Sequence, residues 1–322
     1  MKAVGLLSGG LDSTLAAKLV KEQGLDVEAV TFVTPFCSCG SQASQAAKTL
    51  NIPLKVFDEG KDYLKMVRNP KFGYGRNMNP CVDCKIFMLK KAKRYAKEIG
   101  AKFVFTGEVL GQRPMSQHKQ ELDLIEKEAG LTRKIVRPLS AKLLPKTEAE
   151  RFGLINSNQL EDISGRSRKR QLEMAKKFNI VNFPSPAGGC LLTEQEFAKK
   201  LKDLFKHKTR VSLRDVSLLK VGRHFRLGPN KIVVGRNEKE NMFLQKNKLK
   251  SEYIFEVPIY GSPTTLLTGP KAKKVIQKAA ELTAFYSDNK NKQVRVKFGK
   301  KDLAKEIIVN KLTMAEINEL KI

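Results

Sequence analysis

Apolar residues in the first 130 positions alternate between short continuous runs and stretches with helical spacing. Four apolar runs predict buried strands, and each is followed by a segment with the periodicity of an amphipathic helix. Because strands that alternate with helices favour a parallel, doubly wound sheet, we expect an α/β fold in this part of the chain. The predicted strands are 3–7, 27–33, 54–57 and 102–106, and the predicted helices are 13–23, 40–50, 84–98 and 116–128.

The pattern changes after residue 137. Residues 137–190 predict short helices and loops that end in a turn rich in proline and glycine. Beyond this turn, strands and helices mix without strict alternation, which indicates a smaller α+β module. We therefore predict two domains, residues 1–200 and 210–322. The strands expected in the second domain are 218–227, 231–234, 252–257 and 293–298, and the helices are 270–285 and 313–320.

The loop that joins the first predicted strand to the first helix has the sequence Ser8-Gly9-Gly10-Leu11-Asp12-Ser13. Glycines let backbone N–H groups approach phosphate oxygens, and the N-terminal end of a helix attracts anions. The two serine hydroxyls add hydrogen bonds, and Asp12 can orient Mg²⁺ or the loop itself. The lysine of a Walker P-loop is missing, which disfavours a kinase or a GTPase. We predict a nucleotide site here rather than an ordinary strand–helix turn.

Charge adds a second expectation. The chain has 61 Lys and Arg against 33 Asp and Glu, a formal charge of +28. Basic side chains release counterions when they neutralise phosphates, so the excess predicts a polyanionic partner. A thermophile surface would raise charges of both signs. We interpret one basic cluster as an RNA-binding segment, with a solvated helix face as the alternative. Its members are Arg166, Arg168, Lys169 and Arg170.

The composition also limits where the protein acts. Hydrophobic residues make up 41% of the chain, which is typical of a globular protein. No apolar run is long enough to span a bilayer, and no signal-peptide pattern is present. We therefore expect a cytoplasmic location, no membrane partner and no targeting segment. The sequence leaves a homodimer open.

The five cysteines are the other candidate chemistry. An odd number in a cytoplasmic chain argues against a disulfide framework. Cys81 and Cys84 open a predicted helix with their sulfurs on one face, and a helix N-terminus favours the thiolate form. Together with Cys190 they could hold a [4Fe–4S] cluster or Zn²⁺, carry and resolve a persulfide, or be buried small residues. Whether Cys37 and Cys39 take part is left open.

Several of these segments resemble known families. The loop at 8–13 resembles the signature of the PP-loop ATP pyrophosphatases, which cut ATP between the α and β phosphates and transfer AMP to an oxygen of the substrate. Residues 106–117 and Arg137-Pro138-Leu139 resemble consecutive segments of tRNA 4-thiouridine synthetases. Residues 79–85 are similar to the cysteine loop of tRNA 2-thiouridylases, and their pairing with Cys190 is similar to the three-cysteine site of iron–sulfur-dependent tRNA thiolases.

A second resemblance covers the C-terminal part. Residues 234–241 and 261–265 resemble the NFACT-type RNA-binding domain. We expect Arg236 and Asn237 to contact RNA there, with a generic basic α+β module as the alternative. The 4-thiouridine synthetases carry an RNA-binding domain before the PP-loop, and we expect the C-terminal module to replace it here.

The resemblance implies an ATP-dependent tRNA sulfurtransferase. Such an enzyme adenylates a uridine carbonyl oxygen and replaces it with sulfur, giving 4-thiouridine or, alternatively, 2-thiouridine. The implied cofactors are ATP and Mg²⁺, with sulfur carried on a [4Fe–4S] cluster or a cysteine persulfide. The implied partners are tRNA or another structured RNA and a sulfur donor, either a cysteine desulfurase or free sulfide. Lys85 and Arg113 are candidates to stabilise phosphate charge or, equally, are surface charges.

The resemblance also assigns residues to this reaction. The implied catalytic residues are Asp12, Cys84 and Cys190, and the implied metal ligands are Cys81, Cys84 and Cys190. The implied nucleotide site consists of Leu6, Ser8, Gly9, Gly10, Asp12, Ser13, Phe32 and Gly107. Two other functions stay open: a PP-loop ligase or amidotransferase that acts on a non-RNA substrate, and a non-catalytic RNA-binding factor. RNA-dependent exchange between ATP and pyrophosphate would separate all three.

Overall fold

The computed structural model describes residues 1–37, 40–184 and 190–322. These residues form two compact units, Met1–Glu194 and Gln195–Ile322. Most of the proline- and glycine-rich turn predicted before Cys190 lies outside the described residues. Among the helices of the described chain, none is long and apolar enough to cross a membrane.

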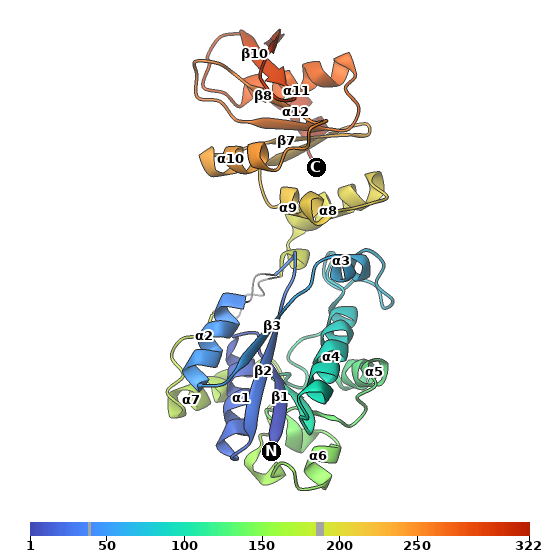
Figure 1. Ribbon diagram of the computed structural model, residues 1–322, viewed down its shortest axis with the longest axis vertical. Helices are drawn as coiled ribbons and strands as arrows, with labels where there is room; N and C mark the ends of the chain where they lie inside the picture. The colour runs from blue at the N-terminus through green and yellow to red at the C-terminus, as the bar shows by residue number, and fades with distance from the viewer. Residues whose placement is uncertain (38–39, 185–189) are drawn as a thin grey trace. The chain divides into compact units, whose positions relative to one another are not determined.

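The first unit is built on a five-stranded sheet in the order β3-β2-β1-β4-β5 (Figure 1). All neighbouring strands are parallel. This confirms the predicted α/β fold, and it places the carboxyl ends of the strands at one edge of the sheet, where ligands of such folds bind. The strands are β1 (Lys2–Leu6), β2 (Asp26–Val33), β3 (Leu54–Asp58), β4 (Phe103–Thr106) and β5 (Ile135–Val136).

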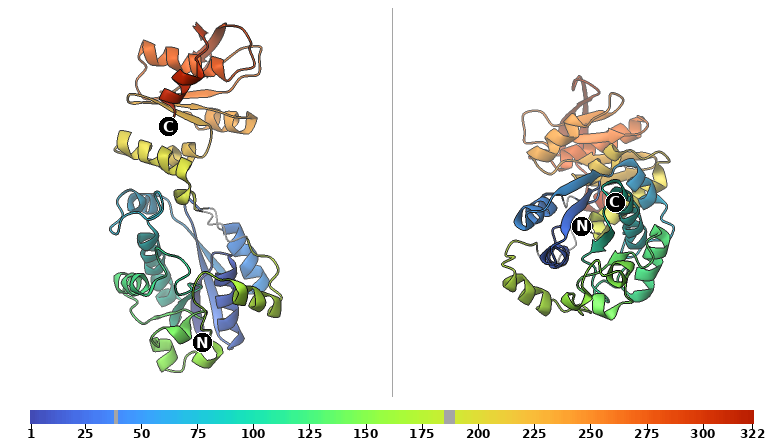
Figure 2. Two further views of the ribbon diagram at one scale, coloured as in Figure 1. Left: turned by 180° about the vertical axis from the view of Figure 1, so that it is seen from behind. Right: turned by 60° about the horizontal axis from the view of Figure 1, so that its bottom comes forward.

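Helices cover both faces of this sheet. Two views from opposite sides show α1, α2 and α7 on one face, and α3, α4 and α5 on the other (Figures 1 and 2). Helix α3 was not expected from the sequence. The helices are α1 (Leu11–Glu22), α2 (Gly40–Leu50), α3 (Lys61–Arg68), α4 (Cys81–Glu98), α5 (Lys119–Ala129), α6 (Glu148–Arg151) and α7 (Lys169–Lys177).

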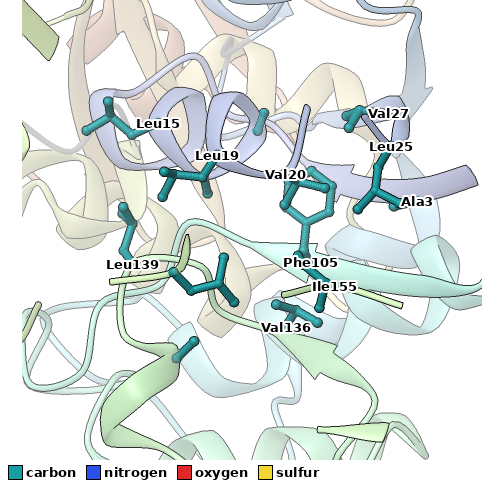
Figure 3. Close-up of a cluster of buried hydrophobic side chains, with 14 of the residues drawn as sticks. Ala3, Leu15, Leu19, Val20, Leu25, Val27, Phe105, Val136, Leu139 and Ile155 are labelled. Carbon is teal, nitrogen blue, oxygen red and sulfur yellow. The ribbon is translucent and has the colours of Figure 1, made fainter. Parts of the chain in front are cut away.

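Two hydrophobic layers follow from the alternation of side chains along each strand. On one face, Ala3 and Phe105 pack against Leu15 and Val20 of α1 (Figure 3). On the other face, Val4 and the strands beside it pack against α4 and α5. Since strands buried on both faces read as continuous apolar runs, this explains why the sequence predicted them so clearly.

Glycine in β1 has a specific packing role. A Cβ atom at Gly5 would lie 2.2 Å from Cζ of Phe105. The bare backbone therefore leaves room for the Phe105 ring, which is fully buried between β1 and α1. This contact fixes the spacing of the two strands that end at the nucleotide loop.

The second unit contains a six-stranded antiparallel sheet in the order β11-β10-β8-β9-β7-β6. Its strands are β6 (Arg223–Leu227), β7 (Asn230–Val234), β8 (Tyr253–Glu256), β9 (Thr265–Thr268), β10 (Gln293–Gly299) and β11 (Lys305–Asn310). Its helices are α8 (Gln195–His207), α9 (Leu213–Leu219), α10 (Glu238–Lys246), α11 (Lys273–Phe285) and α12 (Met314–Leu320). Ile232 and Val234 of β7 face the core beneath α11, and Val233 between them faces the cluster around α10.

The sequence misplaced one boundary and missed some elements in this unit. The strand predicted at 218–227 is wrong at its start, because residues 218–219 end helix α9 and the strand begins at Arg223. A capping box at Ser212 and Asp215 starts that helix, and this polar signal outweighs the apolar run that follows. Strands β9 and β11 and helices α8 and α10 were not expected.

Candidate nucleotide and cysteine site

The loop at residues 8–13 connects β1 to α1 as predicted, and its hydroxyls hold it in shape. Ser13 Oγ donates to the Gly10 carbonyl at 2.9 Å and accepts from the Ser8 amide at 3.3 Å. The hydroxyls of Ser8 and Ser13 lie 3.2 Å apart. No side chain caps Gly10, the residue before α1. The first N–H groups of α1 are therefore presented toward the carboxyl edge of the sheet, as an anion site requires.

Two glycines allow the loop to pack tightly. Gly9 has φ +79°, and a Cβ there would lie 2.3 Å from the Gln42 carbonyl carbon of α2. A Cβ at Gly107, after β4, would lie 2.5 Å from both N and Cα of Ser13. The segment after β4 thus rests directly on the first turn of α1, and neither position tolerates a side chain without movement of the backbone.

Asp12, in the first turn of α1, has one satisfied and one free carboxylate oxygen. Gln112 Nε2 donates to Oδ2 at 3.1 Å, whereas Oδ1 is buried without a hydrogen-bond partner. Burial raises the pKa of Asp12, and this is opposed by the Gln112 hydrogen bond, by the nearby Arg168 and Arg113, and by the amide of Gln171. A buried carboxylate oxygen without a partner at a phosphate-binding loop fits Mg²⁺, which is typically bound by one or two carboxylates together with substrate phosphates.

Behind the loop lies a buried network of charges. Glu108 is 2% exposed and forms ion pairs with Lys85 at 3.3 Å and with Arg137 at 3.1 Å. Arg137 also pairs with Glu126. Burial raises the pKa of Glu108, but Lys85 and Arg137 outweigh it and hold the pKa at about 2. The network joins the cysteine helix α4 to the segments after β4 and β5, so Lys85 serves here as a partner of Glu108.

We expect Glu108→Gln to lower the free energy of unfolding of the first unit by about 3–5 kcal/mol, because it leaves the buried Arg137 and Lys85 undercompensated. Since the folded pKa lies below the usual value of 4.5, the stabilisation by Glu108 is complete above pH 4.5 and is lost as the pH falls toward 2. Urea unfolding of the wild type and of Glu108→Gln should therefore show a difference in unfolding free energy that shrinks as the pH falls from 4.5 toward 2. Glu128→Gln, which removes the exposed ion pair with Lys71, is the control and should cost less than about 1 kcal/mol.

Cys81 and Cys84 lie in the first turn of α4, as predicted. Asp83 between them accepts hydrogen bonds from the amides of Lys71 and Phe72, at 2.8 and 3.0 Å. This carboxylate ties the preceding loop to the helix and so fixes the position of both thiols. Both cysteines are free and partly exposed.

The segment after Cys190 docks against the same loop. The Leu191 amide donates to the Phe36 carbonyl at 3.0 Å, and the Met78 amide donates to the Leu192 carbonyl at 3.0 Å. Cys190 is also free, and the thiols of Cys84 and Cys81 are close enough to contribute to its raised pKa. The structure thus brings Cys190 to the pair Cys81 and Cys84, from which it is far apart in the sequence.

The three thiols are protonated at neutral pH in this state. Burial is the largest effect at each and raises the pKa, to about 11 at Cys190. The expectation that the helix N-terminus favours thiolates at Cys81 and Cys84 is therefore wrong for this state, since desolvation outweighs it. Tyr63 of α3 donates a hydrogen bond to Cys84 Sγ at 3.1 Å, which lowers the pKa of that thiol in part.

Two further predictions about the cysteines concern disulfides and metal binding. Cys37 is disulfide-bonded, so the expectation against disulfides does not hold there, and Cys39 lies outside the described residues. Within the described chain, no three His, Cys, Asp or Glu side chains are arranged to hold a metal ion. As they stand, Cys81, Cys84 and Cys190 converge but do not form the ligand set of a [4Fe–4S] cluster or Zn²⁺.

Arg113 connects the loop and the cysteines. This exposed side chain lowers the pKa of Asp12 and, against the larger effect of burial, also that of Cys81 and Cys190. Its guanidinium is thus near the phosphate loop and near two of the thiols. Both candidate sites therefore lie at the carboxyl edge of the sheet, within electrostatic reach of one side chain.

The residues predicted for adenine binding lie in the first unit, and two of those predicted for RNA binding lie at the start of α10 in the second unit. Leu6 and Phe32 lie near the ends of β1 and β2, and the Phe32 ring stacks on Phe57 with centroids 5.2 Å apart. Arg236 pairs with Glu240, and Asn237 accepts from the Glu240 amide as the cap of α10.

In the basic cluster, Arg170 forms ion pairs with Glu161 and Asp162, and Arg166 and Lys169 are exposed. Arg168 is instead beside Asp12. The cluster is therefore not a uniform row of free cations, and RNA contacts by its members stay a prediction.

Sequence reasoning missed three polar residues at this site. Gln112 hydrogen-bonds to Asp12 and lies in the segment after β4 that resembles 4-thiouridine synthetases. Its place in that motif, five residues after Gly107, could have identified it from the sequence. Gln171 of α7 is completely buried, and its amide meets no partner in hydrogen-bond geometry but lies close enough to Asp12 to lower the pKa of that carboxyl. Tyr63 lies on a helix that the sequence did not predict, so no signal pointed to it.

Comparison with known proteins finds a separate family match in each of the two units. Residues 1–143 match the family described as Thiamine biosynthesis protein (ThiI), and residues 222–320 match the NFACT protein RNA binding domain. The resemblance of the first unit to this PP-loop family and of the second unit to the NFACT-type domain, which the sequence predicted, is thereby confirmed.

Individual relatives match over part of their length. The chain is 32% identical over 174 residues to a tRNA-specific 2-thiouridylase MnmA of Syntrophotalea carbinolica, covering 46% of this chain and 49% of the relative. It is 31% identical over 151 residues to a probable tRNA sulfurtransferase of Thermococcus kodakarensis, covering 43% and 36%. The chain therefore spans half or less of these relatives. Among solved structures, the crystal structure of a protein described as a predicted subunit of tRNA methyltransferase, from Methanocaldococcus jannaschii, aligns with a TM-score of 0.33 at 19% identity. The alignment covers 43% of this chain and 69% of that chain.

Proposed function

We propose that this protein is an ATP-dependent tRNA sulfurtransferase that adenylates a uridine carbonyl oxygen and replaces it with sulfur. The observation that carries the proposal is that the phosphate loop and three converging cysteines lie at the same edge of the sheet, where the charge of Arg113 acts on Asp12, Cys81 and Cys190. Activation by ATP and delivery of sulfur can then take place on one bound base. The formal charge of +28 and the NFACT-type unit supply affinity for tRNA.

In the first step, the carbonyl oxygen of uridine attacks the α-phosphorus of ATP. An oxygen–phosphorus bond forms, the bond to pyrophosphate breaks, and the base becomes adenylated. Ser8, Gly9, Gly10 and Ser13 bind the pyrophosphate through backbone N–H groups and hydroxyls. Asp12 would hold Mg²⁺ through its free oxygen, and the ion would neutralise charge on the phosphates. Gly107 brings the segment after β4 against the nucleotide, and the main chain near Leu6 and Phe32 contacts adenine.

In the second step, a persulfide on Cys190 or Cys84 attacks the activated carbon, and AMP leaves with the former carbonyl oxygen. The other cysteine then attacks the sulfur–sulfur bond. The electrons of that bond pass to the base, which keeps the sulfur, and a disulfide remains between the two cysteines. A dithiol reductant restores both thiols, and a cysteine desulfurase supplies the next sulfur. Burial keeps the free thiols protonated, whereas sulfur transfer requires a deprotonated sulfur. The arriving sulfur and the bound tRNA must therefore change the surroundings of the cysteines so that the proton is lost.

The product is 4-thiouridine in this proposal, and the likeness to 2-thiouridylases favours 2-thiouridine as the second candidate. The test combines purified protein, ATP, Mg²⁺, unmodified tRNA and a desulfurase with cysteine. Mass spectrometry of the digested tRNA should show one thiolated uridine, and pyrophosphate should exchange into ATP only when tRNA is present. Exchange without tRNA would instead indicate a ligase acting on a non-RNA substrate. Binding of tRNA without any exchange would leave only a non-catalytic RNA-binding factor.

A further inference from the structure

The N-terminal end of α7 lies beside the phosphate loop, although some 155 residues separate them in the sequence. Helix α7 packs along α1: Ala175 is part of the same core as Leu11 and Leu15, and Phe178 lies under Lys18 with the ammonium 5.6 Å from the ring centre. This packing directs the first turn of α7 toward the first turn of α1. Both helices therefore present their N-terminal N–H groups on the same side of the unit.

The polar groups at this junction lack the partners that buried groups normally have. Neither atom of the Gln171 amide meets a partner in hydrogen-bond geometry, although the side chain is 0% exposed and lies close enough to Asp12 to lower the pKa of that carboxyl. Arg168 Nε is also buried without a partner, and so are Asp12 Oδ1 and Gln112 Oε1. An orphaned buried polar group costs free energy, so several of them at one place indicate a ligand that pairs with them when it is bound.

The chemistry of these groups identifies the ligand. The guanidinium of Arg168 presents donors in a fork that matches phosphate oxygens, and a Gln amide can donate to the same anion. No side chain caps Arg168, the residue before α7, so the backbone donors of that turn are also presented. The carboxylate of Asp12 beside them requires that the anion arrives with a cation. A magnesium–polyphosphate meets all these requirements.

We infer that the first turn of α7 forms the second wall of the ATP site, in which Arg168 and Gln171 bind the β- and γ-phosphates. This rests on the proposed function, because it assigns further residues to the same nucleotide site. It reassigns Arg168 from the basic cluster that the sequence suggested for RNA. Arg166 and Lys169, which are exposed, remain available to tRNA.

The test measures the dissociation constants of MgATP, magnesium pyrophosphate, AMP and tRNA by titration calorimetry on the full chain. Arg168→Met should weaken MgATP and pyrophosphate about 10- to 100-fold, with AMP and tRNA unchanged. Arg168→Lys, which keeps the charge, should recover part of this loss. Arg166→Met is the matched control in the same exposed segment and should leave MgATP unchanged. Gln171→Ala should weaken MgATP about tenfold, and thermal unfolding must show that each variant is folded.

Two results would overturn the inference while the wild type binds MgATP. The first is weaker tRNA binding by Arg168→Met with unchanged MgATP binding, which would return Arg168 to the RNA surface. The second is no change for either ligand in a folded protein, which would make the side chain structural only. If the wild type itself bound neither MgATP nor pyrophosphate, the proposed function would fall together with this inference.

Discussion

Cys190→Ser should abolish formation of thiolated uridine, with a loss of at least about 10³-fold in rate, while MgATP and tRNA still bind. A hydroxyl matches the thiol in shape, but it cannot carry a sulfane sulfur or attack a sulfur–sulfur bond. Loss of nucleophilic residues that act as a unit typically removes several orders of magnitude of rate. The measurement is nucleoside mass spectrometry after single-turnover reactions, with ATP–pyrophosphate exchange on the same samples. We expect the tRNA-dependent exchange to continue, because adenylation precedes sulfur transfer.

Variants of the other two cysteines separate the possible sulfur carriers. Under persulfide chemistry, Cys84→Ala should be as inactive as Cys190→Ser, and Cys81→Ala should retain much of the activity. Equal loss in all three, with iron and sulfide present in protein purified without oxygen, would instead show that the three thiolates hold a cluster. Full activity of Cys190→Ser would remove the assignment of this residue. Serine at a partly exposed position with free thiols nearby should leave the fold intact, which circular dichroism would check.

The sequence predicted four of the five strands of the first unit, because the central strands are apolar runs and most of the helices that follow have a regular apolar face. It also predicted the loop at residues 8–13, where the glycines and hydroxyls are contiguous and their purpose is local. Cys81 and Cys84 could also be recognised from the sequence, because their spacing is a local pattern. In each case, the information lies within a few neighbouring residues.

The rest of the site depends on contacts that no local pattern reveals. Whether Arg168 faces solvent or Asp12 is decided by how α7 packs on α1, and the sequence shows only a run of basic residues. The protonation of Cys84 depends on burial and on Tyr63, which comes from an unpredicted helix. Likewise, Lys85 reads as a phosphate-binding cation until the structure places it beside Glu108. Tertiary burial changes the chemistry of these groups, and it is not encoded in their neighbours.

Gly107→Ala should also remove activity, but for a different reason. The added Cβ would lie 2.5 Å from backbone N and Cα of Ser13 and 2.6 Å from the carbonyl carbon of Asp12. None of these atoms belongs to a flexible side chain, so either the segment after β4 or the first turn of α1 must shift. Misplacement of binding groups by about 1 Å can cost about 10²-fold in rate. We therefore expect a loss of about 10²-fold or more in tRNA-dependent ATP–pyrophosphate exchange and a lower unfolding temperature.

Gly10→Ala is the matched control for stability, because its Cβ would meet only Ser8 Oγ at 3.5 Å, an ordinary contact. Its backbone also lies outside the left-handed region, with φ −76°, so alanine adds no strain. Gly10→Ala should unfold within a few degrees of the wild type, whereas Gly107→Ala should not. If Gly107→Ala kept wild-type stability and exchange, the segment after β4 would have room to move away from α1. The close contact between Gly107 and the phosphate loop would then have no part in binding ATP, and the nucleotide site would rest on residues 8–13 alone.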